Sequence, residues 1–359
     1  MIAAELRSGA CKILVVIPCL NEEASVGGVI ARALGLRSDY PRLDVLVVDD
    51  GSTDATAECA RQHGAMVLSH PTNRGVGAAF HSGVTFAIER SYELMINIDG
   101  DGQFNPEDIP KLLAPVIEGR ADMATASRFM DRRLLPTMPL VKRIGNATMS
   151  YLISRLVMQK FYDVSCGFRC YSRESLLRLN LHGSFTYTQE SFLDLCSKNL
   201  RVVEVPVPVK YFPDRISRVA RSVFRYARSS GSIIFRAYRD YYPLKFFTYI
   251  ATGFLLPGLA FGVVFGAHFM ITGRFSDYLF AGFISGFLLL LAVLFFVIGI
   301  VADMLDRIRG NQERILYMLK VNSSRVEDPY DPPMGESALD RKSKNSASPM
   351  RQIDTEPRS

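Results

Sequence analysis

Several features typical of common protein classes are missing from this 359-residue chain. Its first ten residues lack the apolar run of roughly 7–15 residues that a cleavable signal peptide needs, so we expect the N-terminal part to stay in the cytoplasm. Its six cysteines show no paired Cys-x-x-Cys spacing, which argues against a disulfide framework in a reducing compartment. There is no Walker A sequence, and Gly75-Val76-Gly77 is an incomplete dinucleotide fingerprint, so NTPase and dehydrogenase functions lose their main support.

Charged residues are also missing from two long stretches of the C-terminal third. No Lys, Arg, Asp or Glu occurs between Lys245 and Arg274, or between Asp277 and Asp303. At about 1.5 Å per residue, either run can cross a hydrocarbon core of about 30 Å. Both runs are apolar on every face, whereas a globular helix usually keeps a polar stripe, so we expect membrane spans rather than buried core helices. The short segment 273–277 leaves room only for a hairpin, which places both helix ends on one side.

Basic residues gather on both flanks of this expected hairpin. They are Lys210, Arg215, Arg218, Arg221, Arg225, Arg228, Arg236, Arg239 and Lys245 before it and Arg307, Arg309 and Arg314 after it. The positive-inside rule makes this side cytoplasmic. The net charge of +6 therefore reflects a local basic belt and indicates a membrane surface, not nucleic acid, as the first partner. Arginines at helical spacing over 218–228 predict an interfacial helix, with a solvated charged face as the alternative.

From Lys12 to about Arg128, short β-rich runs alternate with longer segments of helical spacing. This alternation predicts an α/β fold, with a parallel sheet covered by helices. The expected strands are Ile13–Pro18, Val45–Asp49, Met66–Ser69, Leu94–Ile98 and Met123–Ala126. Further on, we expect helices near 141–159 and 188–199, a compact polar turn over 163–169 and a last strand over 201–210.

Polar residues follow several of these strands directly, at Asn21, Asp49 and Asp99. Open α/β sheets bind ligands at the carboxyl ends of their strands, so these residues predict one crevice. Asp49 and Asp50 stand side by side at the end of one strand. Adjacent carboxylates repel one another, so we expect ligand donors or a cation beside them.

A second acidic cluster, Asp99-Gly100-Asp101-Gly102-Gln103, ends another strand, which could neighbour the first in the sheet. Two carboxylates separated by one glycine can converge on a hard divalent cation, and Gln103 offers a further oxygen. Mg²⁺ typically takes one or two carboxylates together with ligand phosphates, so a nucleotide diphosphate would complete its shell. Mn²⁺ would also suit these oxygen ligands.

Together these segments resemble the inverting family 2 glycosyltransferases, and within them the dolichyl- or undecaprenyl-phosphate sugar transferases. The similarity covers roughly residues 12–302, and its pieces are highly specific in this order. They are Val16–Glu23 (VIPCLNEE), Asp49–Asp54 (DDGSTD), Asn73–Gly77 (NRGVG) and Asp99–Gln103 (DGDGQ). The resemblance implies a GT-A (Rossmann-like) α/β domain over 1–210. We place basic juxtamembrane amphipathic helices over 211–243, two transmembrane helices over 244–303, and a cytoplasmic tail over 304–359 that is disordered after about 322.

The resemblance also implies roles for individual residues. Donor-binding residues would be Pro18, Asn21, Glu22, Asp49, Asp50, Asp99 and Gly100. Asp99, Asp101 and Gln103 would hold Mg²⁺ or Mn²⁺, and the expected catalytic acids are Asp99, Asp101 and Asp163, the last in an acceptor-side turn over Asp163–Arg169. Arg128, Arg143, Arg169 and Arg215 would bind the acceptor phosphate. The segment Arg215-Ile216-Ser217-Arg218 lacks the glycine of the family's membrane-proximal motif, so the role of that loop stays open.

The implied reaction moves one sugar, with inversion, from a nucleotide-diphosphate sugar of the UDP-glucose or GDP-mannose type to polyprenyl phosphate. We expect it at the cytoplasmic face of a membrane, the inner membrane of a bacterium. One alternative is a processive polysaccharide synthase. Against it, two helices offer little wall for a polymer channel, and a chain without Trp has no Gln-x-x-Arg-Trp signature. The other alternative is a non-catalytic membrane scaffold that binds nucleotide sugars. Association into a homo-oligomer through the hairpin is a further expectation.

Overall fold

The computed structural model describes residues 11–323, apart from 132, 134, 136, 137, 139, 182–186, 211–234, 236, 237, 241 and 275. Arg215 and most of the predicted amphipathic segment 211–243 therefore lie outside the described residues. The tail that we expected to be disordered beyond residue 322 lies almost wholly outside them too.

A seven-stranded sheet forms the centre of the N-terminal domain, in the order β3-β2-β1-β4-β6-β5-β7. Its strands are β1 (Ile13–Cys19), β2 (Leu43–Asp49), β3 (Met66–Ser69), β4 (Leu94–Asn97), β5 (Met123–Ser127), β6 (Arg169–Ser172) and β7 (Val202–Pro206). Most are buried on both faces and therefore consist of continuous apolar runs, as in β1 (ILVVIPC). The α/β prediction is confirmed, and every strand that we expected is present.

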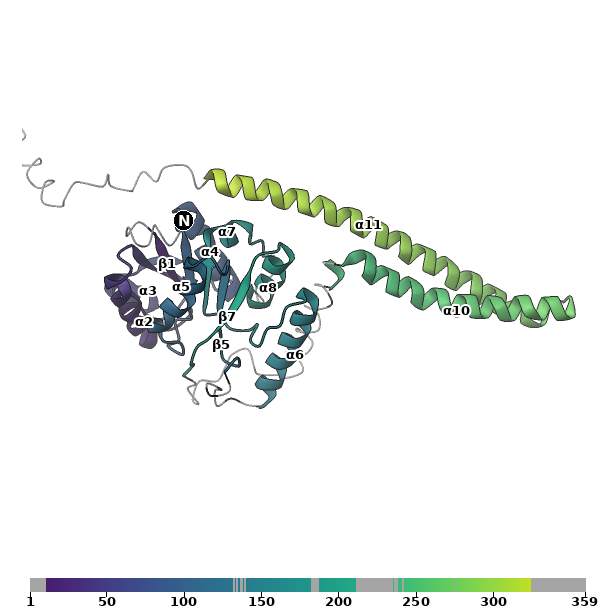
Figure 1. Ribbon diagram of the computed structural model, residues 1–359, viewed down its shortest axis with the longest axis horizontal. Helices are drawn as coiled ribbons and strands as arrows, with labels where there is room; N and C mark the ends of the chain where they lie inside the picture. The colour runs from purple at the N-terminus through teal and green to yellow at the C-terminus, as the bar shows by residue number, and fades with distance from the viewer. Residues whose placement is uncertain are drawn as a thin grey trace, which may run out of the picture.

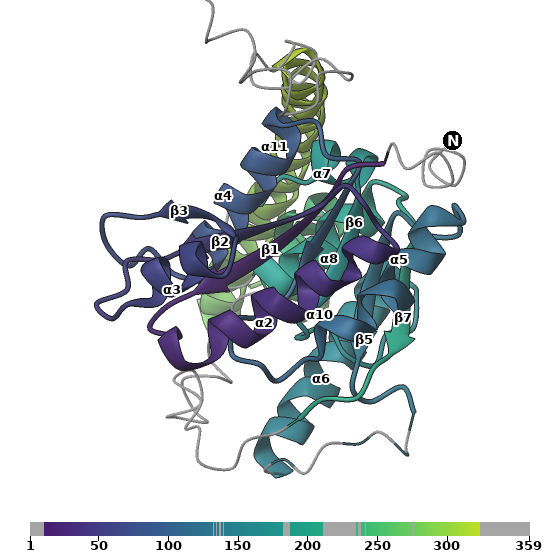
Figure 2. The ribbon, with the colours of Figure 1, turned by 90° about the vertical axis from the view of Figure 1, so that its left-hand side faces the viewer.

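Helices cover both faces of this sheet (Figure 2). On one face, α2 (Glu23–Gly35), α3 (Thr56–Gln62) and α5 (Ile109–Ile117) pack on alternate strand residues such as Val15 and Ile17. On the other, α4 (Val76–Glu89), α6 (Leu140–Val157), α7 (Arg173–Arg178) and α8 (Tyr187–Ser197) pack on the intervening residues, such as Leu14 and Val16. The two-residue alternation along β1 thus divides the core into two layers.

Two details of the sheet differ from our expectation. Arg169, placed in the predicted polar turn, begins the additional strand β6, which runs antiparallel between β4 and β5, so the sheet is mixed rather than parallel. The four residues of β6 are completely buried and too short to carry a periodic pattern. The strands that end near Asp49 and Asp99 are also not neighbours, because β1 pairs with both and separates them.

The predicted hairpin is present, formed by α10 (Pro243–Thr272) and α11 (Leu279–Ser323), which lie side by side in Figure 1. Both helices are long and apolar enough to cross a membrane. α10 starts with Pro243 and ends before Gly273, whose φ of 67° is a left-handed conformation suited to glycine. Small residues let the helices approach, since Ser285 Oγ donates a 2.8 Å hydrogen bond to the Gly258 carbonyl.

The second hairpin helix continues past Asp303 without a break, where we expected only a tail. Charge pairs along the helix support this continuation, including Arg307 with Asp303 at 3.0 Å. We call residues 304–323 the C-terminal extension. Figure 1 shows it running back along the edge of the N-terminal domain, where Tyr317 donates a 3.0 Å hydrogen bond to Glu174 of α7.

Candidate active site

Four predicted site residues gather around the carboxyl end of β1. Their common neighbour is Cys19, the last residue of that strand, whose thiol is buried. Burial raises the pKa of this thiol well above its usual value, and the carboxylates of Glu22, Asp49, Asp99 and Asp101 raise it further. These four acids come from three segments far apart in the sequence, so the structure brings the predicted donor-side and metal-side acids into one cluster.

Close packing of glycines positions Asp99 within this cluster. A Cβ on Gly100 would lie 2.5 Å from Cys19 Sγ, so only glycine lets the loop after β4 pass the end of β1. A Cβ on Gly167 would lie 3.0 Å from Asp99 Oδ1 and equally close to the Tyr187 hydroxyl. Burial, reinforced by the Asp101 carboxylate, raises the pKa of Asp99 to about 6. The two acids therefore destabilise each other's charge, which a bound cation would relieve.

Asp101 and Gln103 share one tight turn. Asp101 Oδ1 accepts a 3.0 Å hydrogen bond from the Gln103 amide, and the Gln103 carbonyl accepts a 2.9 Å bond from the Lys210 amide. No group of three or more His, Cys, Asp and Glu side chains in the described part of the chain could hold a metal ion. The oxygen donors present suit Mg²⁺ or Mn²⁺ only if ligand phosphates supply the remaining positions.

The loop after β1 is tied to the loop after β2. Asn21 has a left-handed backbone conformation with φ 55°. Its side-chain Oδ1 accepts a 2.8 Å hydrogen bond from the Thr53 amide, and its backbone amide donates a 2.9 Å bond to Ser52 Oγ. Asp49, nearly buried, accepts a 3.1 Å bond from the Ser52 amide. Pro18 is buried in β1 beside Val48. Asn21 and Asp49 thus brace the expected donor pocket.

Asp50 has internal partners for both carboxylate oxygens. Oδ1 meets His70 Nδ1 at 2.7 Å and accepts a 3.0 Å bond from the Arg74 amide, and Oδ2 accepts a 2.7 Å bond from the Gly75 amide. Its side chain is 5% exposed. Asp50 therefore holds the loop that leads into α4, an arrangement that favours shaping the predicted donor pocket over direct contact.

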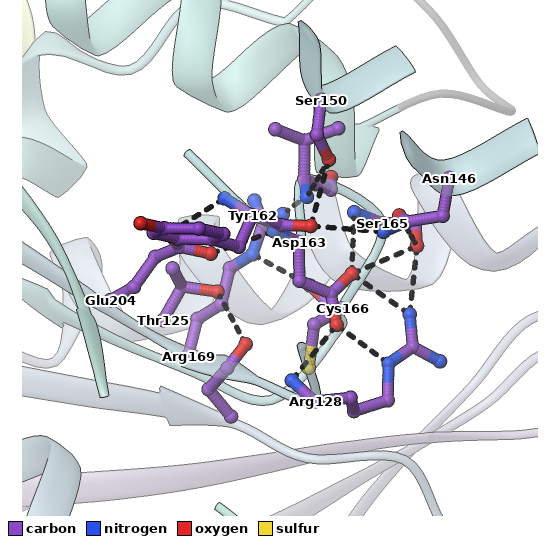
Figure 3. A network of polar contacts seen from close by, with 12 residues as sticks. Thr125, Arg128, Asn146, Ser150, Tyr162, Asp163, Ser165, Cys166, Arg169 and Glu204 are labelled. Carbon is purple, nitrogen blue, oxygen red and sulfur yellow. Dashed lines mark hydrogen bonds and ion pairs between the residues drawn. The ribbon is translucent and has the colours of Figure 1, made fainter. Parts of the chain in front are cut away.

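Asp163 and Arg128 form a buried ion pair (Figure 3). Arg128 donates from Nε to Oδ2 at 2.6 Å and from Nη2 to Oδ1 at 2.9 Å, the bidentate geometry of a strong pair. Arg128 Nη2 also reaches Ser165 Oγ at 2.8 Å, and Glu204 accepts the Asp163 amide at 2.7 Å. The Asp163 side chain has no exposed surface, which suits positioning of Arg128 and not removal of a substrate proton.

Of the other predicted acceptor-side arginines, Arg169 is completely buried. Its Nε donates to the Cys166 carbonyl at 2.8 Å, Nη2 to the Val164 carbonyl at 3.2 Å, and Nη1 to Ser191 Oγ. A side chain without exposed surface does not reach an acceptor phosphate in this conformation, so the structure corrects the expectation of direct contact. Its interactions hold the acceptor-side turn against α8.

Arg143 is exposed on α6 and lines a groove of about 880 Å³ together with Phe129, Tyr151 and Met158. The far end of α6 adjoins the hairpin, because Tyr242 donates a 3.2 Å hydrogen bond to the Leu156 carbonyl. The structure therefore places Arg143 in an open, partly apolar groove that runs toward the membrane helices.

Three residues that sequence reasoning did not single out contribute to this site. Tyr187 lies 3.4 Å from Asn97 Nδ2 and is close to Gly167, facing the Asp99 carboxylate. Glu204 supports the turn that carries Asp163, accepting the Tyr162 amide at 2.8 Å. Neither Tyr187 nor Glu204 lies in a sequence motif. The third residue, Gly167, lies in the predicted turn, but the need for glycine there is seen only once its neighbours Asp99 and Tyr187 are known.

The family model described as glycosyl transferase family 2 matches residues 14–179, which include all four acids of the cluster. An uncharacterized glycosyltransferase of Mycobacterium bovis is 36% identical over 197 residues, which are 54% of this chain and 84% of that protein. The chain belongs to glycosyltransferase family 2. As a member of this family it is an enzyme. The four acids of the cluster lie within the matched segment, at or just after the carboxyl ends of β1, β2 and β4.

Two further relatives of this glycosyltransferase have named activities. An undecaprenyl-phosphate mannosyltransferase of Micrococcus luteus is 28% identical, covering 55% of this chain and 82% of that protein. A UDP-N-acetylglucosamine–dolichyl-phosphate N-acetylglucosaminyltransferase of Methanococcus voltae is 27% identical, covering 55% and 86%. Glucosyl-3-phosphoglycerate synthase of Mycobacterium tuberculosis, solved with Mn²⁺ and UDP-glucose, is 23% identical with a TM-score of 0.50, covering 65% of this chain and 82% of that chain. The predicted GT-A fold is confirmed.

Replacing Gly100 by alanine is expected to lower the free energy of unfolding by about 1–3 kcal/mol, because the new Cβ would overlap Cys19 Sγ. Chemical unfolding followed by circular dichroism measures the loss. In a Cys19→Ala background the same substitution should cost less, since the nearest overlapping atom is gone and only Ile17 Cγ2, at 3.2 Å, still crowds the new Cβ. Gly28→Ala, with no atom within 4 Å of the new Cβ, is the control and should be neutral or slightly stabilising. An equal cost of Gly100→Ala in the wild-type and Cys19→Ala backgrounds would refute the contact.

Asp99→Asn is expected to stabilise the metal-free protein while abolishing transfer. The pKa of Asp99 is about 6 in the folded protein and about 3.9 in the unfolded chain. The ionised carboxylate therefore destabilises the fold above pH 6. As the pH falls, protonation removes this cost. Because Asp99 is partly accessible, the corresponding gain of about 3 kcal/mol is an upper value. Melting temperatures in EDTA should differ most above pH 6 and converge toward pH 4. A difference independent of pH would contradict this explanation.

Proposed function

We propose that this enzyme transfers a single sugar from a nucleotide-diphosphate sugar to polyprenyl phosphate, with inversion, at the cytoplasmic face of a membrane. The observation that carries the proposal is the joining of two features in one chain. A cluster of four carboxylates at the carboxyl ends of the strands suits a donor diphosphate with its cation. A groove lined by Arg143 leads from the same domain toward two membrane-length helices. The activities named for the Micrococcus luteus and Methanococcus voltae relatives support the same acceptor class.

On the donor side, Asn21, Glu22 and Asp49 would line the nucleotide. The carboxylates of Asp99 and Asp101, with the Gln103 amide, would hold Mg²⁺ or Mn²⁺. The proximity of Asp99 to Asp101, which raises the pKa of Asp99, fits a cation at this position. When bound, the cation supplies positive charge that offsets the charge developing on the departing diphosphate. The Mn²⁺ bound in the solved neighbour supports a divalent cation, and its UDP-glucose supports a nucleotide-diphosphate sugar as donor. We propose a donor of the UDP-glucose or GDP-mannose type.

On the acceptor side, exposed Arg143 would bind the lipid phosphate from the groove. Arg128 would face it from a fixed position, held by Asp163 and Ser165. Preorganised guanidinium groups orient a phosphate in line with the anomeric carbon, a geometric contribution to the rate. Arg215, which lies outside the described residues, remains a proposed contributor.

The reaction needs little proton transfer. An acceptor phosphate oxygen attacks the anomeric carbon, the bond from that carbon to the donor diphosphate breaks on the opposite face, and the diphosphate leaves with the electron pair. A phosphate monoester with a second pKa near 6 is largely ionised at neutral pH, so no strong base is required. Buried Asp163 is therefore assigned to positioning Arg128.

Basic residues on the domain side of the hairpin, including Arg307, Arg309 and Arg314, support a cytoplasmic catalytic domain. We further propose that this membrane is the inner membrane of a bacterium. A hairpin anchor keeps the enzyme beside an acceptor whose polyprenyl tail stays in the bilayer.

The decisive experiment incubates the purified full chain with undecaprenyl phosphate in detergent, Mn²⁺ or Mg²⁺, and labelled nucleotide sugars, headed by glucose, mannose and aminoarabinose donors. We expect label to enter the organic phase as a monosaccharide lipid that mild acid releases, with one donor strongly preferred. Label in a long water-soluble polymer would instead support a processive synthase. Tight nucleotide-sugar binding without any transfer or hydrolysis would support the non-catalytic scaffold.

A further inference from the structure

The outer face of the C-terminal extension exposes an unusual number of large apolar side chains. Met304, Leu305, Ile308, Ile315, Leu316, Met318 and Leu319 each expose between 41% and 63% of their surface. Contiguous exposed apolar surface of this kind marks a contact with another molecule.

The bilayer does not account for the far half of this face, from Ile315 to Leu319. Ile315 and Met318 lie 12 and 15 positions beyond Asp303, the first charged residue after the apolar run, so the helix carries them about 18–23 Å further. The same stretch is fixed to the catalytic domain, where Lys320 Nζ donates a 2.8 Å hydrogen bond to the Leu179 carbonyl and Glu313 meets Lys198 at 3.2 Å. These residues are therefore placed in water beside the domain.

Four of these residues, Met304, Ile308, Ile315 and Met318, belong to a seven-residue repeat with alternating spacings of three and four. The repeat also includes Asn311 and starts at Val301, in the last turn of the membrane span. Such spacing forms the seam of a left-handed coiled coil. The residues that open each repeat, Val301, Ile308 and Ile315, are all β-branched. The residues in the second seam position are not β-branched. β-Branched side chains at the first position occur in two-stranded parallel coiled coils, there with leucine at the second position, where this chain has Met304, Asn311 and Met318.

The seam and the docked face lie on opposite sides of the helix. At 3.6 residues per turn, Ile308 and Ile315 project about half a turn away from Glu313 and Tyr317, which contact the domain. In Figure 1 the outer side of the extension carries no other element of the described chain. The domain contacts thus hold the helix rigidly while leaving the seam open to a partner.

We propose that the extension pairs with the same helix of a second copy of this chain, as a parallel two-stranded coiled coil. The membrane hairpin favours this partner over an unrelated protein, because two copies anchored with the same orientation present their helices parallel and at the same height. Confinement to one membrane also raises their effective concentration, which a seam of about three repeats requires.

Asn311 is a polar residue in the second seam position, among apolar neighbours. Only an unstaggered pairing lets it face Asn311 of the second copy, so we propose this register. Each catalytic domain then lies on the outside of the pair.

Cysteine cross-linking in membrane vesicles tests the pairing. The extension contains no native cysteine, so Asn311→Cys places a single thiol in the seam. Arg309→Cys, on the other side of the helix, is the matched control, and the wild-type chain controls for its native thiols. After mild oxidation, Asn311→Cys should give about tenfold more of a band at twice the 40.1 kDa chain mass than Arg309→Cys, on a non-reducing gel.

A second variant separates pairing from folding. Adding Ile308→Glu and Ile315→Glu, both exposed in the single chain, to Asn311→Cys should remove the cross-link without changing the circular dichroism spectrum or the rate of sugar transfer. Equal cross-linking at positions 309 and 311, or no dimer at position 311, overturns the proposal in favour of random collision or of a different partner on this face. Cross-linking that persists in the glutamate variant overturns it as well.

Discussion

Asp101→Ala is expected to reduce sugar transfer about a thousandfold or more while leaving the protein folded. Asp101 stands in a partly exposed turn outside both core clusters, so its truncation creates no cavity. Its carboxylate is one of the two that would hold the cation, and without it the charge developing on the departing diphosphate is poorly compensated. Initial rates with saturating donor, polyprenyl phosphate and Mn²⁺ give the size of the loss, and circular dichroism reports folding.

The matched control is Glu107→Gln, which removes one exposed carboxylate from the same segment. It should retain near-normal rates, so that a loss confined to Asp101→Ala reflects position and not net charge. Full activity of Asp101→Ala with supplemented metal would remove Asp101 from the cation site and with it the assignment of the DGDGQ turn.

Asp163→Ala is expected to lower the free energy of unfolding by about 3–5 kcal/mol, because it leaves the Arg128 guanidinium mostly buried without its carboxylate partner. Asp163→Asn keeps the shape and part of the hydrogen bonding, so its loss should be smaller. Since the chain contains no tryptophan, thermal unfolding is best followed by circular dichroism.

The control for this pair is Asp131→Ala, which breaks an exposed ion pair with Arg133 and should leave the unfolding transition unchanged. Kinetics of Asp163→Asn then test the positioning role. We expect the KM for polyprenyl phosphate to rise more than kcat falls, because Arg128 is less firmly held. Near-normal turnover and KM would show that the charge of Asp163 is dispensable, and an unchanged unfolding curve for Asp163→Ala would contradict the buried pair itself.

Much of the architecture followed from local patterns. The apolar runs Ile13–Pro18 and Leu94–Ile98 are long enough to identify buried strands, and the charge-free stretches after Lys245 and Asp277 identify the hairpin. β6 escaped detection because four buried residues carry no periodicity of their own. The helical extension past Asp303 was missed because its charged residues suggested a tail, although they pair along the helix and one of its faces docks on α7.

The site divides in the same way. The acids that follow strands, Asp49, Asp99 and Asp101, were predicted together, since the carboxyl ends of parallel strands meet at one edge of a sheet. The acceptor-side residues were harder, because their environment depends on partners more than 20 positions away. Arg128 faces Asp163 in an ion pair, whereas Arg169 turns inward toward Ser191.

By itself, the sequence determined the α/β class, the membrane hairpin and the motif acids, because strand length, hydropathy and the residue after a strand are local properties of the chain. Only the tertiary structure decided that β1 stands between the strands ending near Asp49 and Asp99, that Asp163 is buried against Arg128, and that the seam of α11 faces outward. Those outcomes depend on which distant segments pack together. A side chain's charge is written in the sequence, but its exposure and its partner are set by the fold.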